Sequence, residues 1–105
     1  LLHAAEGEHY EWTEMYKEFK DVANEEGFAT IANFFGEVAE VEEQHEKRYR
    51  KLRENVLAGT VFHRDTPVKW RCRNCGYIHE GTDAPDVCPA CAHPKAYYEL
   101  AAENY

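Results

Sequence analysis

The sequence has no run of apolar residues long enough to cross a bilayer and no segment with the pattern of a signal peptide. It is also poor in basic residues, since 12 Lys and Arg stand against 20 Asp and Glu, and the formal net charge is −8. An acidic chain of this kind repels a nucleic-acid backbone. We therefore expect a cytoplasmic protein that binds neither membranes nor nucleic acids.

The sequence lacks cysteine outside one short segment, and it lacks an initiator methionine. No cysteine lies outside Cys72–Cys91, whereas a disulfide scaffold usually spreads its cysteines along the chain. The sequence opens with Leu1-Leu2-His3, inside a helical pattern and without a starting methionine or a capping residue. We expect from this opening that a further segment precedes Leu1 in the intact protein.

Residues 31–56 have the apolar pattern of a long helix. Alternating steps of four and three place eight residues on one face: Ile31, Phe35, Val38, Glu42, His45, Tyr49, Leu52 and Val56. Six are apolar or aromatic, and the two polar residues lie at the centre, where burial is costly. A Glu followed three residues later by a His is a pattern that projects two metal ligands from one helix. The same pattern also fits a partly exposed face with a histidine whose hydrogen bonds are satisfied.

Residues 1–24 predict a second helix, antiparallel to the first. Its inward positions, again with acidic residues at the centre, are Leu1, Ala4, Glu8, Glu11, Met15, Phe19 and Val22. Gly27 is placed to end this helix in the left-handed conformation, and Thr30 to cap the next one. Glu11 lies sixteen residues before Gly27 and Glu42 fifteen after it. At about 1.5 Å per residue both lie roughly 23 Å from the turn, so candidate ligands of both helices are expected at one height.

A composition change divides the chain. We predict a helical domain over residues 1–57, a linker over residues 58–68 and a cysteine domain over residues 69–105. Within the linker, Val61–Phe62 is a candidate edge strand, and Pro67 excludes a helix.

The four cysteines form two Cys-x-x-Cys knuckles and are Cys72, Cys75, Cys88 and Cys91. Four thiolates at this spacing can close a tetrahedral metal site, and a segment this short needs a metal for much of its stability. Gly76 is expected to be left-handed after the first knuckle. We expect a small aromatic core around the metal, made of Trp70, Tyr77, Tyr97 and Tyr98. The spacing alone fits structural zinc as well as a single iron that carries electrons.

Both parts of the sequence resemble the rubrerythrin family. The resemblance covers essentially the whole chain and is carried by four segments: Gly7–Tyr16, Glu42–Arg48 with its Glu-x-x-His, Trp70–Tyr77 and Cys88–Lys95. It implies a ferritin-like four-helix bundle that holds two irons and a C-terminal rubredoxin-like domain that supplies electrons. The implied activity is an indirectly NADH-linked peroxidase that reduces hydrogen peroxide to water and protects against oxidative stress.

The resemblance also implies roles for individual residues. Glu8 and Glu42 would bridge the two irons, and His45 would be the terminal imidazole ligand. Glu11 would be an additional carboxylate that binds one iron in the oxidised site and leaves it on reduction. Tyr16 would lie beside the site, so Glu11 and Tyr16 are the candidate catalytic residues. The four cysteines would bind the third iron, with zinc as a substitute.

The sequence departs from the family pattern before Leu1. Rubrerythrins have two further helices there, with another Glu and another Glu-x-x-His. The expected fold is therefore half of a ferritin-like bundle, a helical hairpin, followed by a rubredoxin-like domain. A complementary N-terminal fragment or a second copy in a homo-oligomer would complete the bundle, and rubredoxin or its reductase would donate electrons.

Two other classes of function remain open from the residues. A ferritin-like protein that oxidises or stores iron would use Glu8, Glu42 and His45 but would need no cysteine module. A zinc-ribbon interaction protein would use the cysteines but would leave Glu8, Glu11, Glu42 and His45 without a task.

Overall fold

The computed structural model describes all 105 residues, which divide into two compact units, Leu1–Asn55 and Val56–Tyr105. The predicted fold class is confirmed: a helical hairpin is followed by a small three-stranded sheet that carries the cysteine knuckles. None of the helices combines the length and the apolar character that crossing a membrane requires.

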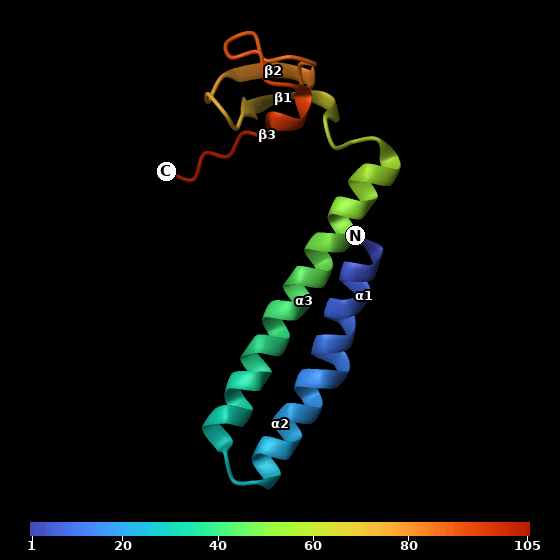
Figure 1. Cartoon of the computed structure of the whole chain (residues 1–105), viewed down its shortest axis with the longest axis vertical. Helices are drawn as coiled ribbons and strands as arrows, with labels where there is room; N and C mark the ends of the chain where they lie inside the picture. The colour runs from blue at the N-terminus through green and yellow to red at the C-terminus, as the bar shows by residue number, and fades with distance from the viewer. The chain divides into compact units, whose positions relative to one another are not determined.

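The first unit is a hairpin of two antiparallel helical arms (Figure 1). The second arm is the long helix α3 (Ala29–Ala58). The sequence pattern predicts one continuous α-helix for the first arm, and this prediction is wrong. The arm consists of α1 (Leu2–Tyr10), a single π-helical turn η1 (Glu11–Met15) and α2 (Tyr16–Glu25). The apolar periodicity did not reveal η1, because one extra residue in a turn shifts the pattern only slightly.

The turn between the arms is set by a left-handed glycine. Gly27 has a φ of 85°, as predicted. Its N–H donates to the carbonyl of Asn24, and the N–H of Phe28 donates to the carbonyl of Ala23, which are the two bonds of a Schellman motif. The predicted cap at Thr30 is wrong. Helix α3 begins at Ala29, two residues earlier than a cap at Thr30 predicts, and the Phe28 carbonyl accepts its first helical hydrogen bond.

The buried apolar residues of the hairpin all have small side chains and are Ala5, Ala23 and Ala32. Much of the predicted apolar face is instead exposed, namely Leu1, Phe19, Val22, Ile31, Leu52 and Val56. Two helices can cover only one side of each other, so the rest of a wide apolar stripe stays outside. Near the turn, the rings of Tyr16, Phe19 and Phe35 pack together with centroids 5.4–6.0 Å apart.

The second unit is an antiparallel sheet in the order β2-β1-β3. Its strands are β1 (His63–Cys72), β2 (Ile78–Asp83) and β3 (Tyr98–Leu100), and a short 3-10 helix η2 (Lys95–Tyr97) precedes β3. The predicted strand at Val61–Phe62 is wrong: β1 begins at His63, inside the segment predicted to be a linker. The pairing of β1 with β2 is irregular between His63 and Val68, around Pro67, because proline cannot donate a ladder hydrogen bond.

The core of the second unit is small and contains two of the cysteines. Its buried members are Trp70, Cys72, Ala84, Cys88 and Tyr98. Two of the four aromatic residues predicted for this core are therefore correct. Tyr77 and Tyr97 are 38% exposed instead, so their rings lie at the surface of the unit. Such a core is too small to stabilise a fold of this size by apolar burial alone.

Candidate metal centres

The central turns of the two helical arms bring three ligand-type side chains together. Glu8 comes from α1, and Glu42 and His45 come from α3. His45 Nδ1 lies 2.6 Å from Glu42 Oε2 and 3.7 Å from Glu8 Oε1. One ligand atom of each residue lies within 4.8 Å of those of the other two. This cluster is called the carboxylate–histidine site below.

The three side chains differ in exposure. Those of Glu8 and Glu42 are 17% and 14% exposed, whereas that of His45 is 50% exposed. The expectation that both central polar residues of the α3 seam are buried is therefore wrong for His45, which is exposed, while Glu42 is only partly exposed. The imidazole stays open to solvent because no third helix of this chain covers that side of α3.

The Glu8 carboxyl group is electrostatically strained in the absence of a cation. Burial raises the pKa of Glu8, and the carboxyl groups of Glu42 and Glu11 raise it further, since like charges disfavour ionisation. Its Oε2 atom is buried without a hydrogen-bond partner. Buried polar atoms almost always have partners, so an unpaired one needs an explanation. A bound cation would supply both the missing partner and the compensating charge.

The donor set therefore fits iron. Two carboxylates and an imidazole are ligands that iron accepts, and they come from facing helices as in di-iron carboxylate bundles. One hairpin supplies one Glu and one Glu-x-x-His, which is half of the ligand set of such a bundle.

The two candidate catalytic residues lie at the ends of the π-helical turn. Glu11 is the first residue of η1, and its carboxyl group is close enough to Glu8 to raise the pKa of Glu8. Tyr16 follows the turn, and its backbone N–H donates to the Glu11 carbonyl, the five-residue spacing of a π-helix. The ring of Tyr16 packs against those of Phe19 and Phe35. π-helical turns occur frequently at functional sites.

The raised pKa of Glu8 predicts how the metal-free hairpin responds to pH. Because the pKa of Glu8 is higher in the folded state, its contribution to stability is fully present below its ordinary value of 4.5 and is lost as the pH rises through the folded pKa. Glu8→Gln removes the charge, so the metal-free variant should unfold at a higher temperature than wild type at pH 7. In a unit of this size about 1 kcal/mol moves the midpoint by roughly 4–8 °C, and we expect a rise of a few degrees.

Circular dichroism of the helices, measured from pH 4 to 8 on the chelated protein, checks this prediction. Glu6→Gln is the matched control because it removes the same charge from an exposed position on α1. Equal midpoints for the Glu8→Gln variant and wild type at pH 7 would show that the carboxylates do not repel one another.

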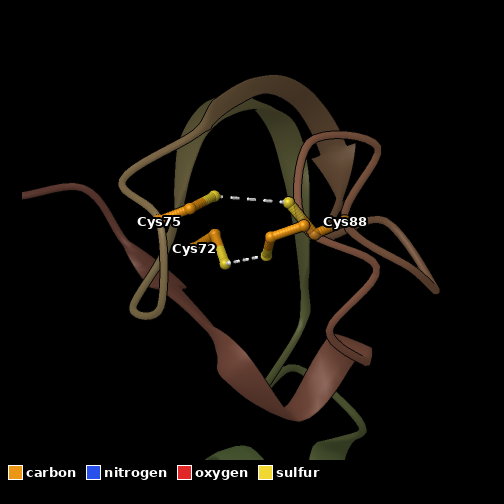
Figure 2. A group of neighbouring side chains, drawn as sticks. Cys72, Cys75 and Cys88 are labelled. Atoms are coloured by element: carbon orange, nitrogen blue, oxygen red, sulfur yellow. Dashed lines mark hydrogen bonds between the residues drawn. The ribbon is translucent and has the colours of Figure 1, made fainter.

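The four cysteines converge between two knuckles in the second unit. Figure 2 shows the sulfur atom of Cys75 facing that of Cys88 across the space between the knuckles. The Sγ atoms of Cys72 and Cys91 are 3.7 Å apart, as are those of Cys75 and Cys88. A disulfide bond is about 2.05 Å long, so all four cysteines are free thiols.

These distances have the size of a tetrahedral metal site. With metal–sulfur bonds of about 2.3 Å, the edges of a regular tetrahedron of sulfurs are about 3.8 Å long. All four Sγ atoms lie within 4.8 Å of one another. The four-cysteine site therefore fits one iron, and its geometry would hold zinc equally well.

The thiols influence one another's ionisation. Burial acts to raise the pKa of Cys88, but the nearby Tyr98 hydroxyl and backbone N–H groups favour the thiolate, outweigh burial and lower the pKa to about 6. At Cys75 a backbone hydrogen bond from Tyr77 acts to lower the pKa, but burial and the three neighbouring sulfurs raise it to about 12. Four thiolates cannot coexist at these distances without a cation, so metal binding must release protons.

The two knuckles have the same backbone design. In the first, the Gly76 N–H donates to the Cys72 carbonyl, and in the second the Ala92 N–H donates to the Cys88 carbonyl, both at 2.9 Å. Gly76 has a φ of 84°, as predicted, and Ala92 has a φ of 60°. No pattern in the sequence predicts that an alanine occupies this left-handed position. An L-residue other than glycine costs about 1–2 kcal/mol there.

Ala92→Gly should therefore stabilise the metal-loaded second unit. Part of the gain is offset because glycine loses more backbone entropy on folding, so we expect a net gain of about 0.5–1 kcal/mol. Thermal unfolding followed in the absorption of the cysteine-bound metal measures it. Ala90→Gly, within the same knuckle but at a residue without positive φ, is the control and should destabilise the unit. A loss of stability in both variants would contradict the strain at Ala92.

The sequence pattern did not predict one buried charged residue, which lies next to His45 in the chain. Glu46 is the only buried charged residue of the chain. It accepts hydrogen bonds from Trp12 Nε1 and Arg50 Nε, both at 2.6 Å, and from His9 Nδ1 at 2.9 Å. Burial acts to raise the pKa of Glu46, but these bonds outweigh it and lower the pKa to about 2.

His9 is half exposed, as expected for a surface residue, but it also belongs to this network. Trp12 could have indicated this network from the sequence, because it is an aromatic N–H donor at the edge of the predicted inward face of the first helix. An indole buried between helices needs an acceptor on the opposite helix.

A hairpin with a carboxylate–histidine site and a sheet with a four-thiolate site, in one chain, define a two-centre non-haem metalloprotein. Two family models match the chain accordingly: "Rubrerythrin" over residues 1–53 and "Rubrerythrin, rubredoxin-like domain" over residues 70–99. The chain belongs to the rubrerythrin family.

Curated relatives resemble the chain over its whole length. It is 54% identical over 105 residues to the rubrerythrin of Nitratidesulfovibrio vulgaris, which covers all of this chain and 55% of that protein. It is 50% identical over 105 residues to Rubrerythrin-1 of Clostridium acetobutylicum and to the rubrerythrin of Porphyromonas gingivalis, covering 54% and 52% of those proteins. The chain therefore spans about half the length of the curated relatives it matches.

Proposed function

We propose that the protein is a non-haem di-iron peroxidase that reduces hydrogen peroxide to water and protects against oxidative stress. One observation carries this proposal: a single chain holds both a carboxylate–histidine cluster with an unpaired buried oxygen and a four-sulfur cluster of metal-site size. A storage protein would not need the second cluster, and a zinc-ribbon protein would not need the first.

The reaction takes up two electrons and two protons for each peroxide and yields two waters. Two ferrous ions in the carboxylate–histidine site would supply both electrons together, and an iron in the four-cysteine site would return them singly. Glu8, Glu42 and His45 would hold the pair of ions. The carboxylates provide negative charge that favours the ferric product, and the imidazole fixes the geometry.

Glu11 and Tyr16 are the residues we propose for catalysis. Glu11 is the first residue of the π-helical turn, and its carboxyl group lies beside Glu8. A small change in the backbone conformation of that turn would therefore move this carboxyl group toward or away from the ions. The hydrogen bond from the Tyr16 N–H to the Glu11 carbonyl links the two residues through the backbone. Tyr16 would carry a hydroxyl proton near the site.

We also propose that the hairpin acts with other helices. It supplies half of the ligands of a di-iron bundle, and its apolar stripe, including Phe19, Ile31 and Leu52, is exposed. Exposed apolar surfaces of this kind are typical of interfaces. A complementary N-terminal segment or a second copy of the hairpin would cover the stripe and complete the site. Free thiols in both knuckles suit the reducing cytoplasm, where rubredoxin or an NADH-linked reductase of rubredoxin would donate electrons.

The visible spectrum of the iron-loaded protein tests the proposal. Thiolate-to-iron absorption should bleach when dithionite reduces the protein anaerobically and return when hydrogen peroxide is added, with two electrons withdrawn per peroxide. A colourless protein with zinc in the four-cysteine site would contradict the electron-transfer function. Recovery of the colour with oxygen but not with peroxide would favour a ferritin-like oxidase.

A further inference from the structure

The Glu46 network lies between the two helical arms. The Glu46 side chain is 10% exposed and accepts hydrogen bonds from Trp12 and His9 on the first arm and from Arg50 on its own helix. The other buried residues at this interface are alanines. A well-packed apolar side chain would often serve a helix interface as well as a buried ion does. Stability alone therefore does not explain the carboxylate.

The network and the carboxylate–histidine site share the same stretches of backbone. His9 follows Glu8, Trp12 follows Glu11, and Glu46 follows His45. Neighbouring residues in a helix point about 100° apart, so the ligands and the network occupy different sides of the same turns. A displacement of the backbone at a network residue therefore also displaces the neighbouring residue that carries a ligand-type side chain.

Trp12 belongs to the π-helical turn η1. A π-helical turn has less favourable packing than an α-helical turn and needs support from outside. Two side-chain hydrogen bonds supply it: the Thr13 hydroxyl donates to the His9 carbonyl at 2.5 Å, and Trp12 Nε1 donates to Glu46 at 2.6 Å. Of these two, the bond from Trp12 ties the turn to α3. Without it, residues 11–15 could rewind into α-helix, which would rotate Glu11 relative to Glu8.

We propose that Glu46 is a positioning residue for the carboxylate–histidine site. By binding the indole N–H of Trp12, it fixes the π-helical turn against α3 and keeps the Glu11 carboxyl group beside Glu8. This inference rests on the proposed function in so far as Glu8, Glu42 and His45 bind iron. It assigns Trp12 and Glu46, which are not among the ligand-type residues of the cluster, to holding the geometry of that site.

The Trp12→Phe variant tests the proposal, because it removes the indole N–H and keeps an aromatic ring. The variant is measured as the assembled protein. We expect the affinity of the carboxylate–histidine site for ferrous iron, titrated anaerobically, to fall about 10–100-fold, the usual effect of losing a partner that orients ligands. The amide of Tyr16, which closes the π-helical hydrogen bond, should exchange with solvent faster. Iron content of the four-cysteine site should not change. Tyr10→Phe, which removes an exposed hydroxyl from the same arm, is the matched control.

Glu46→Leu separates positioning from packing. It fills the interface, so the thermal midpoint should stay near that of wild type, while the iron affinity should fall as in the Trp12→Phe variant. Glu46→Gln keeps one acceptor oxygen for Trp12 and should recover part of the affinity. Wild-type affinity and wild-type Tyr16 exchange in the Trp12→Phe or Glu46→Leu variant would overturn the proposal. If wild type itself binds no iron at Glu8, the proposed function fails, whereas the Tyr16 exchange still decides whether Glu46 fixes the turn.

Discussion

Replacing Cys88 by serine should abolish metal binding in the four-cysteine site and unfold the unit Val56–Tyr105. Cys88 is buried in the core of that unit, and its thiol has the lowered pKa that favours a thiolate ligand. The apolar core contains only five buried residues, whereas binding of a metal by four such ligands contributes on the order of 10 kcal/mol or more to folding. Losing a buried ligand therefore removes most of the free energy that keeps the unit folded.

Metal content and the dispersion of the amide signals of residues 56–105 in NMR spectra measure this outcome. The helical signal in circular dichroism should remain, because Leu1–Asn55 is a separate compact unit. Ala90→Ser, in the same knuckle, is the matched control and should keep both metal and fold. Cys75→Ser should have a milder effect, since Cys75 is exposed and water can take part of its place. A second unit that stays folded without metal in the Cys88→Ser variant would refute the dependence on metal.

Replacing His45 by alanine should empty the carboxylate–histidine site and leave the four-cysteine site loaded. His45 Nδ1 is within 3.7 Å of both carboxylates and is the only nitrogen donor of the cluster. Loss of a direct ligand should exceed the 10–100-fold loss of affinity that follows from losing an orienting partner. We therefore expect at least a 100-fold decrease in the affinity of this site for ferrous iron.

Iron per chain, measured together with the visible thiolate-to-iron absorption, distinguishes the two sites in this variant. Total iron should fall while the absorption per chain stays constant. Gln44→Ala, at the neighbouring exposed position of α3, controls for a change in the helix itself. Proportional loss of total iron and of absorption would show that the two sites are not independent, and the proposal of separate centres would then be wrong.

The sequence alone determined the two-part architecture and the chemistry of both clusters. The period of the apolar residues predicts two helices, and Gly27 predicts the turn that makes them antiparallel. The spacing of the cysteines predicts two knuckles. These features are local, because a helix period, a left-handed glycine and a Cys-x-x-Cys turn each depend on a few consecutive residues.

Tertiary structure decided what local patterns cannot contain. The π-helical turn at Glu11–Met15 is joined to α3 by the hydrogen bond from Trp12 to Glu46, two residues that lie 34 apart in the sequence. Whether a predicted inward side chain is buried depends on what packs against it, so His45 and much of the apolar stripe are exposed in this chain. The left-handed Ala92 is enforced by closure of the second knuckle. The local sequence determines which conformations have low free energy, and long-range packing determines which of these the chain adopts.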